Sequence, residues 1–165
     1  MSILNNCKQL ALDVNEALRE QGLMLATAES CTGGSIAASI TSCAGSSDVF
    51  KGGVVAYSNE VKSSILGVSP RTIAVYGAVS EQTVREMVLG VQRVLRCDCA
   101  VATSGIAGPS GGTADKPVGT VWIAVAVGEN VKTELLQLED KGRDENICAS
   151  VKKVLSLLLN TVREN

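Results

Sequence analysis

Histidine is absent from this chain of 165 residues. Mechanisms that pair serine or cysteine with histidine are therefore excluded, and a general base must be a lysine, a carboxylate or a tyrosine. Histidine is also missing as a zinc ligand, and Cys97 and Cys99 lack the two-residue gap of a zinc-binding pair. We therefore expect no metal and no other cofactor.

Aromatic residues, basic runs and long hydrophobic runs are scarce as well. Aromatic side chains make up 2% of the chain and hydrophobic ones 45%, so we expect one aliphatic core in a single domain over residues 1–165. No apolar run approaches the roughly 20 residues that cross a bilayer, and the first residues lack the pattern of a signal peptide. The net charge of -2, without a basic run, argues against a nucleic-acid partner. We expect a cytoplasmic protein that binds neither membrane nor nucleic acid.

The six cysteines do not form the pattern of a disulfide framework. Cys7, Cys43, Cys99 and Cys148 fall within apolar periodic segments, where a free cysteine behaves as a small hydrophobic residue. This placement favours a reducing compartment.

Hydrophobic periodicity predicts helices that alternate with strands. Helices are expected over residues 3–21, 33–44, 59–66, 81–95 and 143–161, with a helical turn within 70–79. Strands are expected over 23–29, 53–57, 99–103, 120–127 and 131–138, the last two as a hairpin. This order predicts a three-layer α/β/α sandwich on a mixed sheet.

The sequence LATAESCTGG at residues 25–34 predicts a strand that enters a helix through two glycines. Such a turn directs backbone N–H groups at one point, which suits an anion or a developing oxyanion. Ser30, at its tip, could be a nucleophile or simply the N-cap of the helix. Candidate groups for binding an oxyanion or a phosphate belong to Cys31, Thr32, Gly33 and Gly34. The Cys31 thiol is a second conceivable nucleophile, or a small buried side chain.

A second polar segment, AYSNEVK at residues 56–62, contains a lysine and a tyrosine. A solvated Lys62 would have no catalytic role, but a desolvated one has a lowered pKa and can activate a serine without histidine. Tyr57 could orient the amine or pass a proton, or be a buried phenol with one hydrogen bond.

The third polar segment is a glycine-rich loop over residues 104–119, whose spacing fits neither a phosphate-binding P-loop nor a dinucleotide fingerprint. Its backbone could surround a ligand, or its glycines could serve tight turns alone. The loop residues that we expect to contact substrate are Ser104, Gly105, Ile106 and Gly108. Arg143, at the start of the last helix, could bind a phosphate or be an ordinary exposed arginine.

Taken together, these segments resemble the CinA C-terminal-domain family, whose single-domain members are nicotinamide-nucleotide amidases. The resemblance runs from about residue 5 to residue 160. Its motifs are TAESCTGG at 27–34, GVVAYSNEVK at 53–62, GAVSE at 77–81, and SGIAGP at 104–109 followed by KPVGTVW at 116–122.

The resemblance implies hydrolysis of the carboxamide of nicotinamide mononucleotide, a small-molecule nucleotide substrate, to nicotinate mononucleotide and ammonia. It implies Ser30 as the nucleophile, Lys62 as the general base and Tyr57 as an assisting residue, with backbone N–H groups near Thr32 or Gly105 holding the oxyanion. It also implies a mixed, mostly parallel five-stranded sheet with one antiparallel strand.

One stretch departs from the family pattern. Many members begin the last helix with Gly-Asp-Arg and have a further arginine about one turn later, whereas this chain has Lys141 and Gly142 before Arg143, and Ile147 at the later position. An alternative function is therefore a catalytically silent domain that binds a nucleotide or a partner. A phosphotransferase that uses the turn at residues 30–34 is a weaker alternative. We expect a homo-oligomer.

Overall fold

A computed structural model describes residues 2–165 of the chain. Its elements are α1 (Ile3–Gln21), β1 (Leu25–Glu29), α2 (Ser35–Thr41), the 3₁₀ turn η1 (Ser46–Asp48), β2 (Phe50–Val55), α3 (Asn59–Ser64), α4 (Pro70–Tyr76), α5 (Glu81–Leu95), β3 (Cys99–Gly105), β4 (Thr120–Val127), β5 (Asn130–Gln137) and α6 (Arg143–Glu164). The predicted helices and strands are confirmed. The main differences are a shorter α2 and a β2 that begins three residues early, and the ambiguous segment 70–79 contains α4.

The five strands form one sheet in the order β2-β1-β3-β4-β5. β1 pairs in parallel with both β2 and β3, whereas β4 is antiparallel to β3 and to β5. β4 alone therefore runs against the other four strands. The predicted mixed sheet with one antiparallel strand is confirmed.

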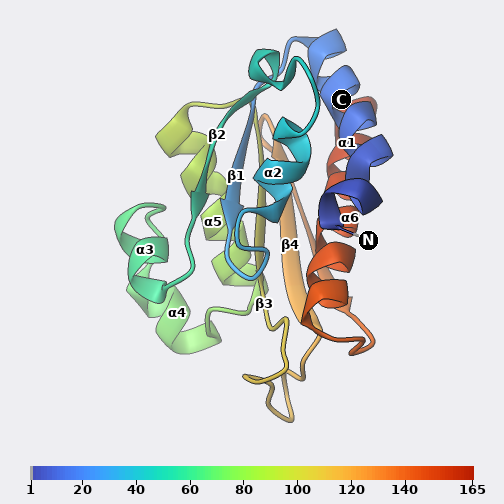
Figure 1. Cartoon of the computed structure of the whole chain (residues 1–165). Coiled ribbons are helices and arrows are strands. Elements are labelled where there is room, and N and C mark those ends of the chain that lie inside the picture. Colours follow the sequence, from blue (N-terminus) through green and yellow to red (C-terminus); the bar gives the residue numbers. More distant parts are fainter. Residues whose placement is uncertain (1) are drawn as a thin grey trace.

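Helices cover both faces of this sheet (Figure 1), so the three-layer architecture is confirmed. The two faces differ in side-chain size because successive residues of a strand point to opposite sides. Alanines face α5, whereas larger aliphatic residues of the same strands face α1 and α6. The alanines that face α5 are Ala26, Ala28, Ala100, Ala102, Ala124 and Ala126.

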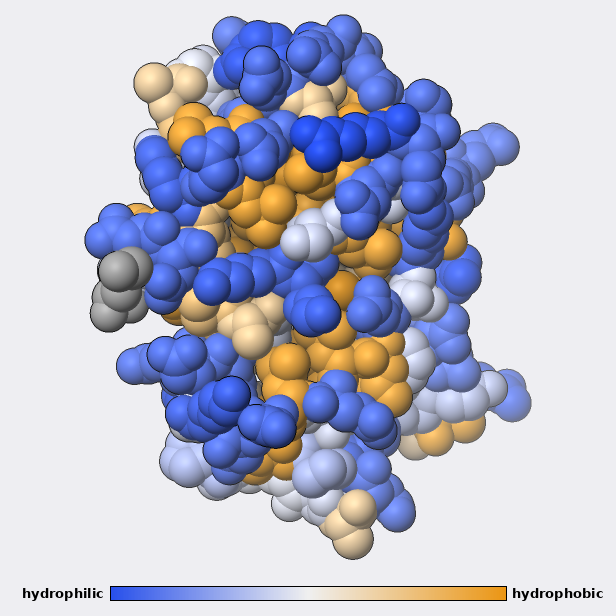
Figure 2. All heavy atoms as spheres, turned by 90° about the vertical axis from the view of Figure 1, so that its right-hand side faces the viewer, coloured by the Kyte–Doolittle hydropathy of each residue, from blue (hydrophilic) through white to orange (hydrophobic). Residues whose placement is uncertain are grey.

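On the side of α1 and α6, polar side chains surround an interrupted band of apolar ones (Figure 2). Leu4 and Leu12 of α1 are among the exposed large apolar residues of the molecule. No helix within residues 2–165 combines the length and the apolar character that a membrane span needs.

The parallel strands β2, β1 and β3 end at the same edge of the sheet, since Glu29 pairs with Val55 on one side and with Thr103 on the other. After β1 the chain continues into β2, which pairs with one edge of β1, whereas β3 pairs with its other edge. Ligands of α/β proteins bind at such a point, beyond the carboxyl ends of the strands. The three polar segments identified in the sequence all meet at this edge.

Candidate active site

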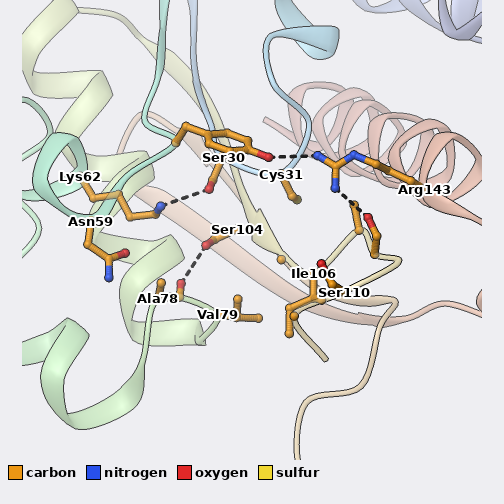
Figure 3. A pocket seen from close by; sticks show the side chains of 15 residues that line it. Ser30, Cys31, Asn59, Lys62, Ala78, Val79, Ser104, Ile106, Ser110 and Arg143 are labelled. Atoms are coloured by element: carbon orange, nitrogen blue, oxygen red, sulfur yellow. Dashed lines mark hydrogen bonds between the residues drawn. The ribbon is translucent and has the colours of Figure 1, made fainter. Parts of the chain in front are cut away.

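Ser30 and Lys62 are brought together at this edge of the sheet (Figure 3). Ser30 directly follows β1, and Lys62 lies in α3, which begins where the Ser58 hydroxyl accepts a hydrogen bond from the Val61 N–H. The Lys62 Nζ is 3.1 Å from the Ser30 Oγ and donates to the carbonyl of Ala56 at 3.0 Å. Only 2% of Lys62 is exposed, so the alternative of a solvated lysine is wrong.

The surroundings of Lys62 disfavour its charged form. Within residues 2–165, none of the ion pairs involves Lys62. Burial therefore lowers the pKa of the Lys62 amine below its ordinary value of 10.5, because the ammonium form loses its hydration. A neutral amine next to a hydroxyl can accept the proton of that hydroxyl.

The turn that presents Ser30 is held by the buried carboxylate of Glu29. Its two oxygens accept the backbone N–H groups of Ile36 and Ala37 at 2.8 and 3.0 Å, in the first turn of α2. The Thr32 hydroxyl donates to the same carboxylate at 2.7 Å. The N-cap position of α2 is Gly34, so the interpretation of Ser30 as the N-cap is wrong and its hydroxyl is left for Lys62.

Two successive residues of this turn require glycine. Gly33 and Gly34 have φ angles of 58° and 99°, in the left-handed region that side chains disfavour. Within residues 2–165, no backbone carbonyl accepts a hydrogen bond from the N–H of Cys31, the residue after Ser30, although the thiol of the same residue contacts this N–H.

The Cys31 thiol lies beside Ser30 but is not activated. Burial raises the pKa of this thiol to about 11, despite a hydrogen bond with Thr103 that lowers it. The thiol is therefore protonated near neutral pH, which removes Cys31 as a competing nucleophile.

A pocket of about 280 Å³ opens in front of Ser30 and Lys62. The expected site residues that line it are Ser30, Cys31, Tyr57, Lys62, Ser104, Gly105, Ile106, Gly108 and Arg143. Thr32, Gly33 and Gly34 are not among the lining residues, and Thr32 instead supports the turn from behind. The lining also includes Asn59, Ala78 and Val79, which sequence reasoning did not select. Asn59 lies in a polar segment that was singled out, and the two apolar residues, which have no chemical signature of their own, lie in the family motif GAVSE at 77–81.

Tyr57 and Arg143 lie together at the pocket. The Arg143 guanidinium donates to the Tyr57 hydroxyl at 3.0 Å and to the carbonyl of Gly108 at 2.8 Å. Tyr57 is 60% exposed, so the alternative of a buried phenol is wrong. Its hydrogen bond goes to Arg143, and none to Lys62 is present within the described residues.

The departures near the start of α6 do not add a second cation to this pocket. Lys141 pairs with Glu139 at 3.4 Å, and both side chains are exposed. Ile147 is half-buried and packs against the core on the α1 and α6 side. The described residues also contain no group of three or more cysteine, aspartate or glutamate side chains placed to hold a metal ion.

A family model described as "CinA C-terminal domain" matches residues 7–162. The chain belongs to the CinA C-terminal domain family. A CinA-like protein of Shewanella piezotolerans is 50% identical over 142 residues, which are 86% of this chain and 34% of that protein. The chain thus spans about a third of the length of such CinA-like relatives.

Another relative has a length closer to that of this chain. It is called nicotinamide-nucleotide amidohydrolase PncC, comes from Enterobacter agglomerans, and is 54% identical over 118 residues, or 72% of either chain. Among solved structures, the competence/damage inducible protein CihA from Agrobacterium tumefaciens superposes with a TM-score of 0.91 at 43% identity, covering 94% of this chain and 96% of that one. A CinA superfamily protein from Klebsiella pneumoniae gives a TM-score of 0.92 at 35% identity, covering 96% and 98%.

Proposed function

We propose that this chain hydrolyses the carboxamide of nicotinamide mononucleotide to nicotinate mononucleotide and ammonia, as a step of pyridine-nucleotide salvage in the cytoplasm. The observation that carries the proposal is the buried Lys62 amine 3.1 Å from the Ser30 hydroxyl in a pocket. The name of the Enterobacter agglomerans relative supports the choice of substrate.

In the proposed reaction, neutral Lys62 takes the proton of Ser30 while the serine oxygen attacks the amide carbon. The Cys31 N–H, which donates to no backbone carbonyl in the described chain, would hold the oxyanion of the tetrahedral intermediate. The Lys62 ammonium then returns the proton to the departing nitrogen, which leaves as ammonia and gives an ester on Ser30. A water molecule, activated by the same amine, hydrolyses this ester and restores the serine hydroxyl.

Arg143 is the candidate for the phosphate of the nucleotide. Its guanidinium lines the pocket and is held by Gly108 and Tyr57, so its orientation is fixed before a ligand arrives. Tyr57 would assist through this contact.

The experiment is ammonia release from nicotinamide mononucleotide by the wild type and by Ser30→Ala. We expect release by the wild type and a loss of about a thousandfold or more in the variant, since no other activated nucleophile is in place. Release by Ser30→Ala at the wild-type rate would overturn the serine mechanism. Absence of release by the wild type would overturn the amidase proposal.

A catalytically silent nucleotide-binding domain is the second candidate. It is favoured by the start of α6, where Lys141 and Ile147 lie outside the pocket and Arg143 is the only arginine among the described residues that line it. This candidate predicts calorimetric binding of the mononucleotide without ammonia release.

We also propose that the chain forms a homo-oligomer, with the exposed Leu4 and Leu12 on α1 as candidate contacts. Sedimentation velocity measures the mass of the particle in solution. A monomer at all protein concentrations would contradict the proposed oligomer.

A further inference from the structure

Ser104 is a buried hydroxyl in the pocket that the proposed reaction does not yet use. It lies in β3, is 1% exposed, and lines the pocket. Its Oγ is 2.8 Å from the carbonyl oxygen of Ala78, in the connection between α4 and α5 (Figure 3).

The direction of this hydrogen bond is fixed by chemistry. A carbonyl oxygen has no hydrogen, so the Ser104 hydroxyl must be the donor. With its only hydrogen committed to Ala78, the Ser104 oxygen can offer the pocket nothing but lone pairs. The Ala78 carbonyl is likewise an acceptor, so the Ser104 side chain and the Ala78 carbonyl together offer the pocket only acceptors.

The sheet places this wall next to the nucleophile. Glu29 of β1 pairs with Thr103 of β3, and the Ser30 N–H donates to the Thr103 carbonyl at 3.0 Å. Ser30 and Ser104 each lie one residue beyond this pair, so they are side by side where two neighbouring parallel strands, about 4.8 Å apart, come to the edge of the sheet. Both side chains line the same pocket, so a carboxamide whose carbon meets the Ser30 Oγ would bring its nitrogen toward Ser104.

We infer that Ser104 determines specificity for the amide over the acid, an inference that rests on the proposed function. The NH₂ of a carboxamide has two hydrogens and can donate one of them to the Ser104 oxygen. The carboxylate product has none, so its oxygen would face the lone pairs of Ser104 and Ala78 and be repelled. The contact holds the leaving nitrogen of the substrate and favours departure of the acid.

Removing the Ser104 hydroxyl would change which ligand this wall accepts. In Ser104→Ala, the Ala78 carbonyl loses its donor, and a water molecule in the pocket can donate one hydrogen to it. Its second hydrogen is free to donate to a carboxylate. The acid is therefore expected to bind more tightly and the amide slightly less.

The test measures binding without turnover, by calorimetry on Ser30→Ala with nicotinamide mononucleotide and with nicotinate mononucleotide. We expect the preference for the amide to fall about tenfold when Ser104→Ala is added, as is typical for one hydrogen bond and one repulsive contact. Ser104→Thr keeps the hydroxyl and should keep the preference. Ser104→Cys, a weak acceptor of similar shape, should lose part of it and replaces the alanine variant if that variant fails to fold.

Ser150→Ala is the matched control. Ser150 is also 1% exposed and also donates to a carbonyl at 2.8 Å, that of Asn146, but it does not line the pocket. Its loss should leave the ratio of the two affinities unchanged. An unchanged ratio in Ser104→Ala and Ser104→Cys would overturn the inference while leaving the amidase proposal intact. Absence of ammonia release by the wild type, with neither ligand bound, would overturn both.

Discussion

Arg143 joins Tyr57 to the glycine-rich loop with one guanidinium. One of its terminal nitrogens donates to the Tyr57 hydroxyl and the other to the Gly108 carbonyl. The start of α6, the connection between β2 and α3, and the loop after β3 are thus linked at the pocket. A lysine ammonium cannot reproduce this planar fork.

Arg143→Lys is therefore expected to weaken substrate binding more than it slows the chemical step. The KM for nicotinamide mononucleotide should rise about ten- to a hundredfold, as expected for a charged hydrogen-bonding group, with a smaller change in kcat. Steady-state ammonia release as a function of substrate concentration measures both KM and kcat. Lys141→Ala is the control, because this nearby cation pairs with Glu139 outside the pocket, and its KM should stay near that of the wild type. A loss confined to kcat would contradict the role of Arg143 in binding.

Lys62 predicts the pH dependence of the reaction. Only the neutral amine can accept the Ser30 proton, so kcat/KM should rise with pH through the pKa of Lys62, which burial places below 10.5. Lys62→Met should lose activity by about a hundred- to ten-thousandfold, the usual contribution of a general base. Ammonia release as a function of pH gives the midpoint. A rate that falls as pH rises toward this midpoint would contradict the assignment.

The same lowered pKa also predicts a pH dependence of stability. Between the pKa of folded Lys62 and 10.5, the unfolded chain binds more protons than the folded one, so the free energy of unfolding gains from Lys62 as pH rises. Lys62→Met has no such gain. The Tm of the wild type, measured relative to that of Lys62→Met, should therefore increase from neutral to alkaline pH. A constant difference in Tm would mean that Lys62 is charged in the folded protein.

The elements of the fold follow from local patterns. The periodic spacing of apolar residues acts within a few positions, and so do the caps of the helices. Ser58 and Ser80 begin two helices as N-caps, and the left-handed Gly22 ends α1, all close to where the sequence predicts. The pairing of Ser30 with Lys62 was identified by resemblance to a family. The burial of Lys62 depends on how α3 lies beyond the carboxyl ends of the strands, where the amine reaches Ser30 and the Ala56 carbonyl, and periodicity does not determine this placement.

The parts that sequence reasoning missed depend on tertiary contacts. Ala78 and Val79 reach the pocket because the Ser104 hydroxyl and the Lys116 amine hold the residues around Gly77, through the carbonyls of Ala78 and Tyr76. Glu29 was passed over because nothing in the sequence shows that a carboxylate at the end of a buried strand turns toward the residues that follow it. Its partners are the N–H groups of a helix that begins six residues later.

Glu29→Gln tests how far this buried carboxylate holds the turn at Ser30. Glutamine keeps the shape, but its NH₂ replaces one acceptor and must face a backbone N–H of Ile36 or Ala37. We expect a loss of about 2–3 kcal/mol in unfolding free energy, from hydrogen bonds to a charged group, and a lower kcat. Denaturant-induced unfolding measures the free energy of unfolding, and ammonia release measures kcat. Glu16→Gln, on the exposed face of α1, is the control and should change stability by at most about 0.5 kcal/mol.

Cys31 offers a direct test of the microenvironment beside the nucleophile. With its pKa raised to about 11 by burial, about one thiol in ten thousand is ionised at pH 7, against a few per cent of an ordinary cysteine. Alkylation of Cys31 by iodoacetamide in the native protein should therefore be at least about a hundredfold slower than that of a free cysteine, and faster as pH approaches 11. Peptide mass spectrometry over time gives the rate at this position.

The same peptide in the unfolded protein is the control and should react at the ordinary rate. Rapid alkylation at neutral pH would mean that the thiolate is stabilised beside Lys62, and Cys31 would then compete with Ser30 as the nucleophile.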